Sequence, residues 1–125
     1  MVVFFPSHMT NAYILDWAMD GYGQLKMDLN EGQFQYEEES GTNHIRVSVS
    51  LDKLENFVSI VQKHLSAPCN YVDIQFPDEG ITVIIFSQKI FKITNSEQNN
   101  QAKQWAIGQG LPVEQANWGI SYHTQ

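Results

Sequence analysis

The chain has few of the residues on which disulfides, metal centres and nucleic-acid surfaces depend. Cys69 is the only cysteine among 125 residues, which excludes an intrachain disulfide framework and a zinc site built from thiolates of this chain. One arginine, Arg46, and six lysines stand against 14 acidic residues, too few to form a basic surface for a phosphate backbone. The sequence therefore favours a reducing compartment and predicts no direct nucleic-acid binding.

Long apolar runs are missing as well. No run approaches the roughly 20 residues that span a bilayer, and the start MVVFFPSH has no basic residue ahead of its short apolar part, unlike a signal peptide. The length of 125 residues and the apolar fraction of 42% suit one globular domain. We therefore expect a soluble cytoplasmic protein with a single domain over 1–125 and no membrane contact.

The acidic residues are unevenly distributed along the chain. Residues 1–40 contain seven acids and one lysine, whereas residues 41–125 contain seven acids and six basic residues, so nearly all of the net charge of -7 lies in the first third. An acidic field repels phosphate backbones and anionic membranes and attracts basic proteins. Solubility alone also favours such a charge, and both interpretations stay open.

The first third shows helical spacing followed by alternation. TNAYILDWAMDG begins with the cap-forming residues Thr10 and Asn11 and ends at Gly21, which predicts a first helix. Segments 25–29 (LKMDL) and 34–38 (FQYEE) then alternate apolar and polar residues. Together with IRVSVS, which follows the second of two short connections containing Gly, they predict an antiparallel meander of three strands.

The middle of the chain predicts a helix and a hairpin. Apolar residues recur at helical spacing over 51–65, and Pro68 follows. Segments 71–76 and 81–86 flank the turn PDEG. The expected register places Val72, Ile74 and Phe76 opposite Ile81, Val83 and Ile85.

The remaining elements follow from similar patterns. Ile84 and Phe86 make the second face of 81–86 apolar too, which predicts a central strand. A turn at Ser87 and Gln88 would start a further strand, since typical strands have about 5 to 6 residues. A helix from Ser96 to Gly108 or Gly110 and a helical turn from Pro112 to Asn117 complete the chain.

These elements give the order α-βββ-α-βββ-α-α. The predicted fold class is α+β, with a single antiparallel sheet of about six strands and the helices packed mainly on one of its faces. In such a sheet Glu37 would lie between Lys26 and Arg46, and Glu39 would face His44.

Glu38, in the segment QYEEES, is the anomaly in this register. It shares the apolar side of its strand with Phe34 and Tyr36, where an unpaired carboxylate is costly. Two interpretations follow: the strand frays before Glu38, or its carboxylate is held at the rim of the core for a purpose.

Catalytic and metal-binding patterns are not recognisable. The four histidines, His8, His44, His64 and His123, have no ligand spacing, and no nucleophile elbow is present. Cys69 and His64 are close enough in sequence to meet, but a nucleophile also needs an oriented base. We therefore predict no catalytic residue, no metal and no cofactor.

Aromatic residues gather near the end of the chain. Trp105, with Ala102 and Ala106, is expected to anchor the last helix on the sheet. Trp118 and Tyr122 are less constrained to be buried because they lie near the end of the chain beside glycine or polar residues. Both residue types are enriched at interface hot spots.

Two C-terminal segments, DEGITVIIFSQKIFKIT and QAKQWAIGQGLPVEQANWGISY, resemble bacterial immunity proteins of contact-dependent and polymorphic toxin systems, as do the size and acidity of the chain. The resemblance implies a non-catalytic inhibitor that binds a basic toxin domain, often a nuclease, and covers its active site. The residues expected at the interface are Glu38, Glu39, Asp78, Glu79, Trp118 and Tyr122.

Two other classes remain open. One is a small-molecule-binding domain or small enzyme with its pocket between the sheet and the helices. The other is an adaptor subunit that binds its own copies through an edge strand.

Overall fold

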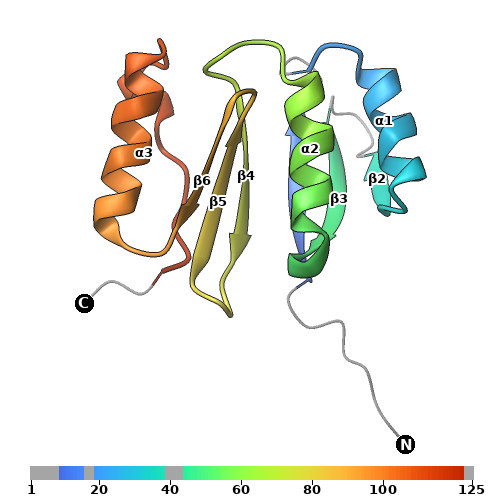
Figure 1. The fold of residues 1–125 in the computed structure, drawn as a ribbon, viewed down its shortest axis with the longest axis horizontal. Coiled ribbons are helices and arrows are strands. Elements are labelled where there is room, and N and C mark those ends of the chain that lie inside the picture. Colours follow the sequence, from blue (N-terminus) through green and yellow to red (C-terminus); the bar gives the residue numbers. More distant parts are fainter. Residues whose placement is uncertain (1–8, 16–18, 39–43, 123–125) are drawn as a thin grey trace, which may run out of the picture.

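The computed structural model describes residues 9–15, 19–38 and 44–122, which contain three α-helices and six strands. The element order is β1 (Met9–Leu15), α1 (Tyr22–Glu31), β2 (Tyr36–Glu38), β3 (His44–Ser50), the 3-10 turn η2 (Leu51–Lys53), α2 (Leu54–His64), β4 (Tyr71–Phe76), β5 (Ile81–Phe86), β6 (Lys89–Ile93), α3 (Ser96–Gly108) and the 3-10 turn η3 (Val113–Gln115). The α+β class is thereby confirmed (Figure 1).

The six strands form two antiparallel sheets of three strands each, so the prediction of a single sheet is wrong. The first sheet has the order β1-β3-β2 and the second has the order β4-β5-β6. β1 and β4 lie side by side, but in the described residues the backbone ladders join each of them to its own sheet. We call the line along which β1 and β4 meet the seam.

The first helix and the first strand are exchanged relative to the sequence prediction. Segment 10–21 was expected to be helical, but residues 9–15 form β1, where Ala12 and Ile14 alternate into the core. Segment 25–29 was expected to be a strand but lies in α1, where Leu25 and Leu29 are fully buried. The spacing of the apolar residues in 25–29 fits the period of a strand and also that of a helix. The segment is helical because α1 packs against α2.

The second half of the chain follows the prediction closely. The expected helix over 51–65 forms as η2 and α2, and the predicted strand that starts after Ser87 and Gln88 forms as β6. The observed register pairs Phe76 with Ile81, Ile74 with Val83 and Val72 with Ile85, as expected. β5 is the central strand of its sheet, which confirms the interpretation of Ile84 and Phe86.

Two apolar cores lie on opposite faces of the second sheet. Val83 and Ile85 belong to the first core, which α1 and α2 cover across both sheets. Ile84 and Phe86 belong to the second core, which α3 and the C-terminal segment 111–122 cover. Figure 1 shows α2 and α3 on either side of the second sheet. The prediction that the helices lie mainly on one face is therefore wrong, since β5 is apolar on both faces and needs two covers.

Among the described residues, the first sheet has a cover on one face only. Ala12, Ile14, Ile45, Val47 and Val49 point into the first core. The residues that alternate with them on β1 and β3 form the other face, which we call the open face.

Candidate functional site

The open face carries three large apolar side chains along β1. Met9, Tyr13 and Leu15 are 48%, 54% and 40% exposed, whereas Ala12 and Ile14 between them are fully buried. The period-two alternation of a strand puts the three exposed side chains on one side. They form a row of large apolar groups, with the exposed Asn11 between Met9 and Tyr13, on a backbone that is fixed by the core behind it.

β3 and β2 continue the open face with polar groups. The Tyr13 ring packs against the edge of the His44 ring, with 6.0 Å between the ring centroids. Arg46, opposite Tyr13 in the register, donates a hydrogen bond to the Glu37 carboxylate on β2. The expected cross-strand pair of Glu37 and Arg46 is thus confirmed, and the open face changes from apolar to charged between β1 and β2.

A cavity of about 560 Å³ opens at the seam, next to the apolar row. Three parts of the chain supply its walls: the first sheet, β4 with the loop before it, and the C-terminal segment. Their contributions include Tyr13, Leu15, His44, Cys69, Tyr71, Asp73 and Gln115. Its size is within the range of about 300 to 1,000 Å³ that is usual for ligand pockets.

Tyr71 and Asp73, both on β4, give the cavity its polar character. Burial raises the pKa of the Tyr71 phenol, and the negative charge of Asp73 raises it further. The phenol therefore stays protonated and donates to the backbone carbonyl of Gln115 over 3.0 Å. The Asp73 carboxylate accepts a hydrogen bond from Nε2 of Gln75 over 3.2 Å.

Gln75 holds the C-terminal wall of the cavity in place. Its Nε2 donates to the carbonyl of Gly119 over 2.9 Å, and its Oε1 accepts from the hydroxyls of Thr82 and Ser121, both over 2.6 Å. The backbone N–H of Ser121 in turn donates to the Thr82 hydroxyl over 2.8 Å. These bonds fasten the C-terminal segment across β4 and β5, so the cavity has a fixed wall on that side.

Glu38 takes a different position from both interpretations of the sequence. It is the last residue of β2 and pairs with Ile45, so the strand does not fray before it. Its side chain is 62% exposed and accepts a hydrogen bond over 2.6 Å from Lys26 on α1. That bond is the main cause that raises the pKa of Lys26. The Glu38 carboxylate therefore lies at the surface in an ion pair, and Glu39 lies outside the described residues.

Lys26 was expected to face Glu37 across two strands, and this expectation is wrong. Because Lys26 lies on a helix, its ammonium group reaches Glu38 instead.

Asp78 and Glu79 lie in the turn between β4 and β5, far along the chain and in a different sheet from Glu38. Asp78 is exposed and Glu79 is partly exposed. Tyr122 is partly buried against the second core. The predicted interface residues that the structure describes therefore do not converge on the open face.

The sequence placed little constraint on the burial of Trp118, and in the structure this side chain is 6% exposed. Its indole N–H donates to Oδ1 of the buried Asn99 over 2.8 Å, and its ring packs edge-on against Tyr71 with 5.3 Å between centroids. The indole packs against the Phe86 ring on β5 and helps to bury it from solvent. Trp105 anchors α3 on the sheet, as predicted, and its partner there is Phe86, with 4.8 Å between the ring centroids.

Sequence reasoning missed the row on β1 and the walls of the cavity. The signal for the row was present, because Met9, Tyr13 and Leu15 alternate with Ala12 and Ile14. The assignment of a helix to this segment concealed it. The cavity had no comparable signal, since it depends on the meeting of β1, β4 and the C-terminal segment.

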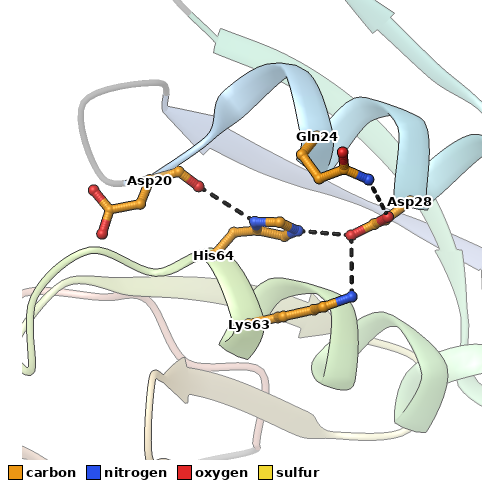
Figure 2. A network of polar contacts seen from close by, with 5 residues as sticks. All are labelled: Asp20, Gln24, Asp28, Lys63 and His64. Carbon is orange, nitrogen blue, oxygen red and sulfur yellow. Dashed lines mark hydrogen bonds and ion pairs between the residues drawn. The ribbon is translucent and has the colours of Figure 1, made fainter.

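A partly buried polar network joins the two helices of the first core (Figure 2). Nε2 of His64 on α2 lies 2.7 Å from the Asp28 carboxylate on α1, and Nδ1 lies 3.3 Å from the backbone carbonyl of Asp20. Gln24 donates to Asp28 over 2.9 Å, and the Lys63 ammonium lies 3.5 Å away. The hydrogen bond from His64, then that from Gln24, lowers the pKa of Asp28.

This network connects structural elements. Asp20 also donates its backbone N–H to the His64 carbonyl over 2.6 Å, so the residue ahead of α1 is bonded to the end of α2 twice. The described residues contain no group of three or more His, Cys, Asp or Glu side chains suited to a metal ion. We therefore assign the network to the attachment of α1 to α2.

Comparisons with known proteins give no relative for this chain: it matches no protein-family model, and no curated protein or solved structure is significantly similar to it. None of the helices in the described part of the chain combines the length and apolar character needed to cross a membrane. The site must therefore be interpreted from its own geometry and charge.

Proposed function

We propose that this protein is a non-catalytic inhibitor of the immunity-protein class, which binds and neutralises a cognate basic toxin domain in the cytoplasm. The observation that carries the proposal is the row of Met9, Tyr13 and Leu15 on the open face. A nuclease domain is the kind of toxin whose substrate groove has the complementary charge.

The row has features of an interface core, although Asn11 separates Met9 from the neighbouring pair of Tyr13 and Leu15. Single exposed apolar residues are ordinary on a protein surface, but neighbouring large apolar groups with polar residues around them are typical of a binding site. Tyr13 is a residue type enriched at binding hot spots, and it loses little side-chain entropy when it is bound. Polar groups at the margin, among them Glu37 with Arg46, would form the rim.

The acidity of the chain supports association with a basic partner through its long-range field. Glu37 and Glu38 are engaged with Arg46 and Lys26, so they do not form an unpaired acidic patch. The net charge of -7 remains, and it raises the rate of encounter with a cationic protein more than it raises affinity.

Co-expression tests this function. The toxin domain would come from a neighbouring gene that encodes a large secreted protein, and the wild-type chain is expected to restore growth. The double variant Tyr13→Asp with Leu15→Asp should lose this protection, since it places two charges in the centre of the interface. Met27→Asp is the matched control, because Met27 is a 57% exposed apolar residue on α1, away from the open face.

Circular dichroism and urea unfolding of all three proteins would show that the fold is retained. Equal protection by the Tyr13/Leu15 double variant and by the wild-type chain would contradict an interface on the open face. Absence of protection by the wild-type chain, with the toxin domain active, would contradict the function itself.

The seam cavity favours a second function, the binding of a small molecule. Its volume of about 560 Å³ is sufficient for a metabolite, and it combines aromatic walls with a carboxylate. A ligand that binds the folded state raises the melting temperature in proportion to its affinity. A screen of metabolites by melting temperature therefore tests this alternative, and it is supported if a positive result is lost in Tyr13→Leu.

A further inference from the structure

The seam cavity has the charge of a cation site. Of the eleven described residues that line it, none is lysine or arginine, and Asp73 is the one acidic residue. Within the part of the chain that the structure describes, the Asp73 carboxylate accepts one hydrogen bond, from Gln75, and a carboxylate has the capacity for several more. The effect of Asp73 on the pKa of Tyr71 indicates that its charge is felt inside the cavity.

The walls suit a planar cation. Tyr13, His44 and Tyr71 bring three aromatic rings to the cavity. A guanidinium group stacks on aromatic rings and binds a carboxylate through two parallel hydrogen bonds, whereas an ammonium group is a more strongly hydrated point charge. The Tyr71 hydroxyl donates its proton to the Gln115 carbonyl. It therefore does not occupy the Asp73 carboxylate, which can accept hydrogen bonds from a ligand.

We infer that the seam cavity receives a guanidinium group, presented by an arginine side chain of the bound partner, with Asp73 as its anion and Tyr13 as its exposed aromatic wall. The inference rests on the proposed function, since it names the contact that the basic partner makes. The cavity borders the apolar row through Tyr13 and Leu15, so one partner surface would cover both. Arginine is also among the residues that dominate binding energy at interfaces.

The test uses the full chain and a small probe in place of the partner. N-acetyl-arginine amide is titrated into isotope-labelled protein, and backbone amide shifts are followed by NMR. We expect saturable shifts centred on 69–73 and 115–117. N-acetyl-citrulline amide, which has the same shape without the charge, should bind at least about tenfold more weakly because it forms neutral hydrogen bonds.

Variants assign the effect to named residues. Asp73→Asn keeps an oxygen that can accept from Gln75 but removes the charge, and it should weaken the probe at least about tenfold. Tyr13→Leu should weaken it about two- to fivefold. Glu31→Gln makes the same charge change at an exposed position on α1 and should leave probe binding unchanged.

Equal binding of the arginine and citrulline probes, or full probe binding by Asp73→Asn, would overturn the inference. Failure of the inference is distinguishable from failure of the proposed function. If the wild-type chain protects against the toxin domain and Asp73→Asn protects equally, the inhibitor function is supported and the guanidinium site is rejected. If the probe binds as expected but the chain gives no protection, the inhibitor function is rejected and the binding of a guanidinium group in the cavity is supported.

Discussion

The two sheets of this protein have three strands each but differ in how many of their faces are covered. β5 in the second sheet is buried on both sides, by α2 on one face and by α3 with the C-terminal segment on the other. β1 and β3 in the first sheet are buried on one side and leave the open face to solvent. The second sheet is therefore the better-buried scaffold, and the first sheet presents side chains on its surface.

The difference shows how a small domain can combine stability with an exposed apolar surface. Burial of apolar area supplies most of the stabilisation of a fold, so a sheet with two covered faces can support a neighbour with one. The open face can then carry Met9, Tyr13 and Leu15, which add little to folding and are available for binding. The following substitutions test this division.

The largest expected effect is at Phe86, in the centre of the second core. Its ring is fully buried against Tyr71, Trp105 and Trp118. Phe86→Ala should lower the free energy of unfolding by about 3 to 5 kcal/mol, measured by urea denaturation. The exposed Tyr13→Ala should cost less than about 1 kcal/mol. Similar losses at both positions would refute the division between scaffold and presenting surface.

A smaller loss is expected when the second core loses its buried hydrogen bond. Trp118→Phe removes the indole N–H and leaves Oδ1 of Asn99 without that donor. A buried polar group without a partner lowers the free energy of unfolding by about 1 to 3 kcal/mol. The double variant Trp118→Phe with Asn99→Leu should be more stable than the sum of the two single losses implies. Strict additivity in this double-mutant cycle would show that the bond contributes nothing of its own.

The attachment of α1 to α2 should appear in the pH dependence of stability. Asp28 has a pKa below its ordinary value of 3.8 in the folded protein. The stabilisation that follows is present above pH 3.8, the value of the unfolded chain, and is lost as the pH falls through the lower folded value. Asp28→Asn should therefore be less stable than the wild type at pH 6, and the gap should narrow below about pH 4. A gap that is constant between pH 6 and pH 3, measured by urea unfolding, would contradict this role.

The smallest effect is expected at the ion pair of the open face. The Glu37 side chain is mostly exposed, so Glu37→Gln should change the free energy of unfolding by at most about 1 kcal/mol. The difference from the wild type should decrease further in 1 M salt, since exposed charges are screened. A loss as large as that of Trp118→Phe would mean that the open face is a structural part of the fold.

The sequence determined those elements whose pattern has one solution. β5 has apolar residues on both faces, and PDEG fixes the turn before it, so the register with β4 and the central place of β5 could be predicted. The helical spacing of α2 and the polar start of α3 were equally clear. The pair of Glu37 with Arg46 followed from the alternation together with the expected loop over 40–43.

Tertiary structure decided the elements whose pattern has two solutions and the site that depends on them. Leu25 and Leu29 fit a strand as well as a helix, and only the packing of α1 on α2 distinguishes the two. The burial of Trp118 likewise depends on the need of Phe86 for a cover.

The seam and its cavity arise where β1, β4 and the C-terminal segment meet. The alternation along a strand indicates which of its faces is buried, but it does not indicate which other strand lies beside it. For this reason the sequence alone could establish the α+β class and most of the elements, whereas the division into two sheets and the position of Asp73 in a cavity beside Tyr13 came from the folded chain.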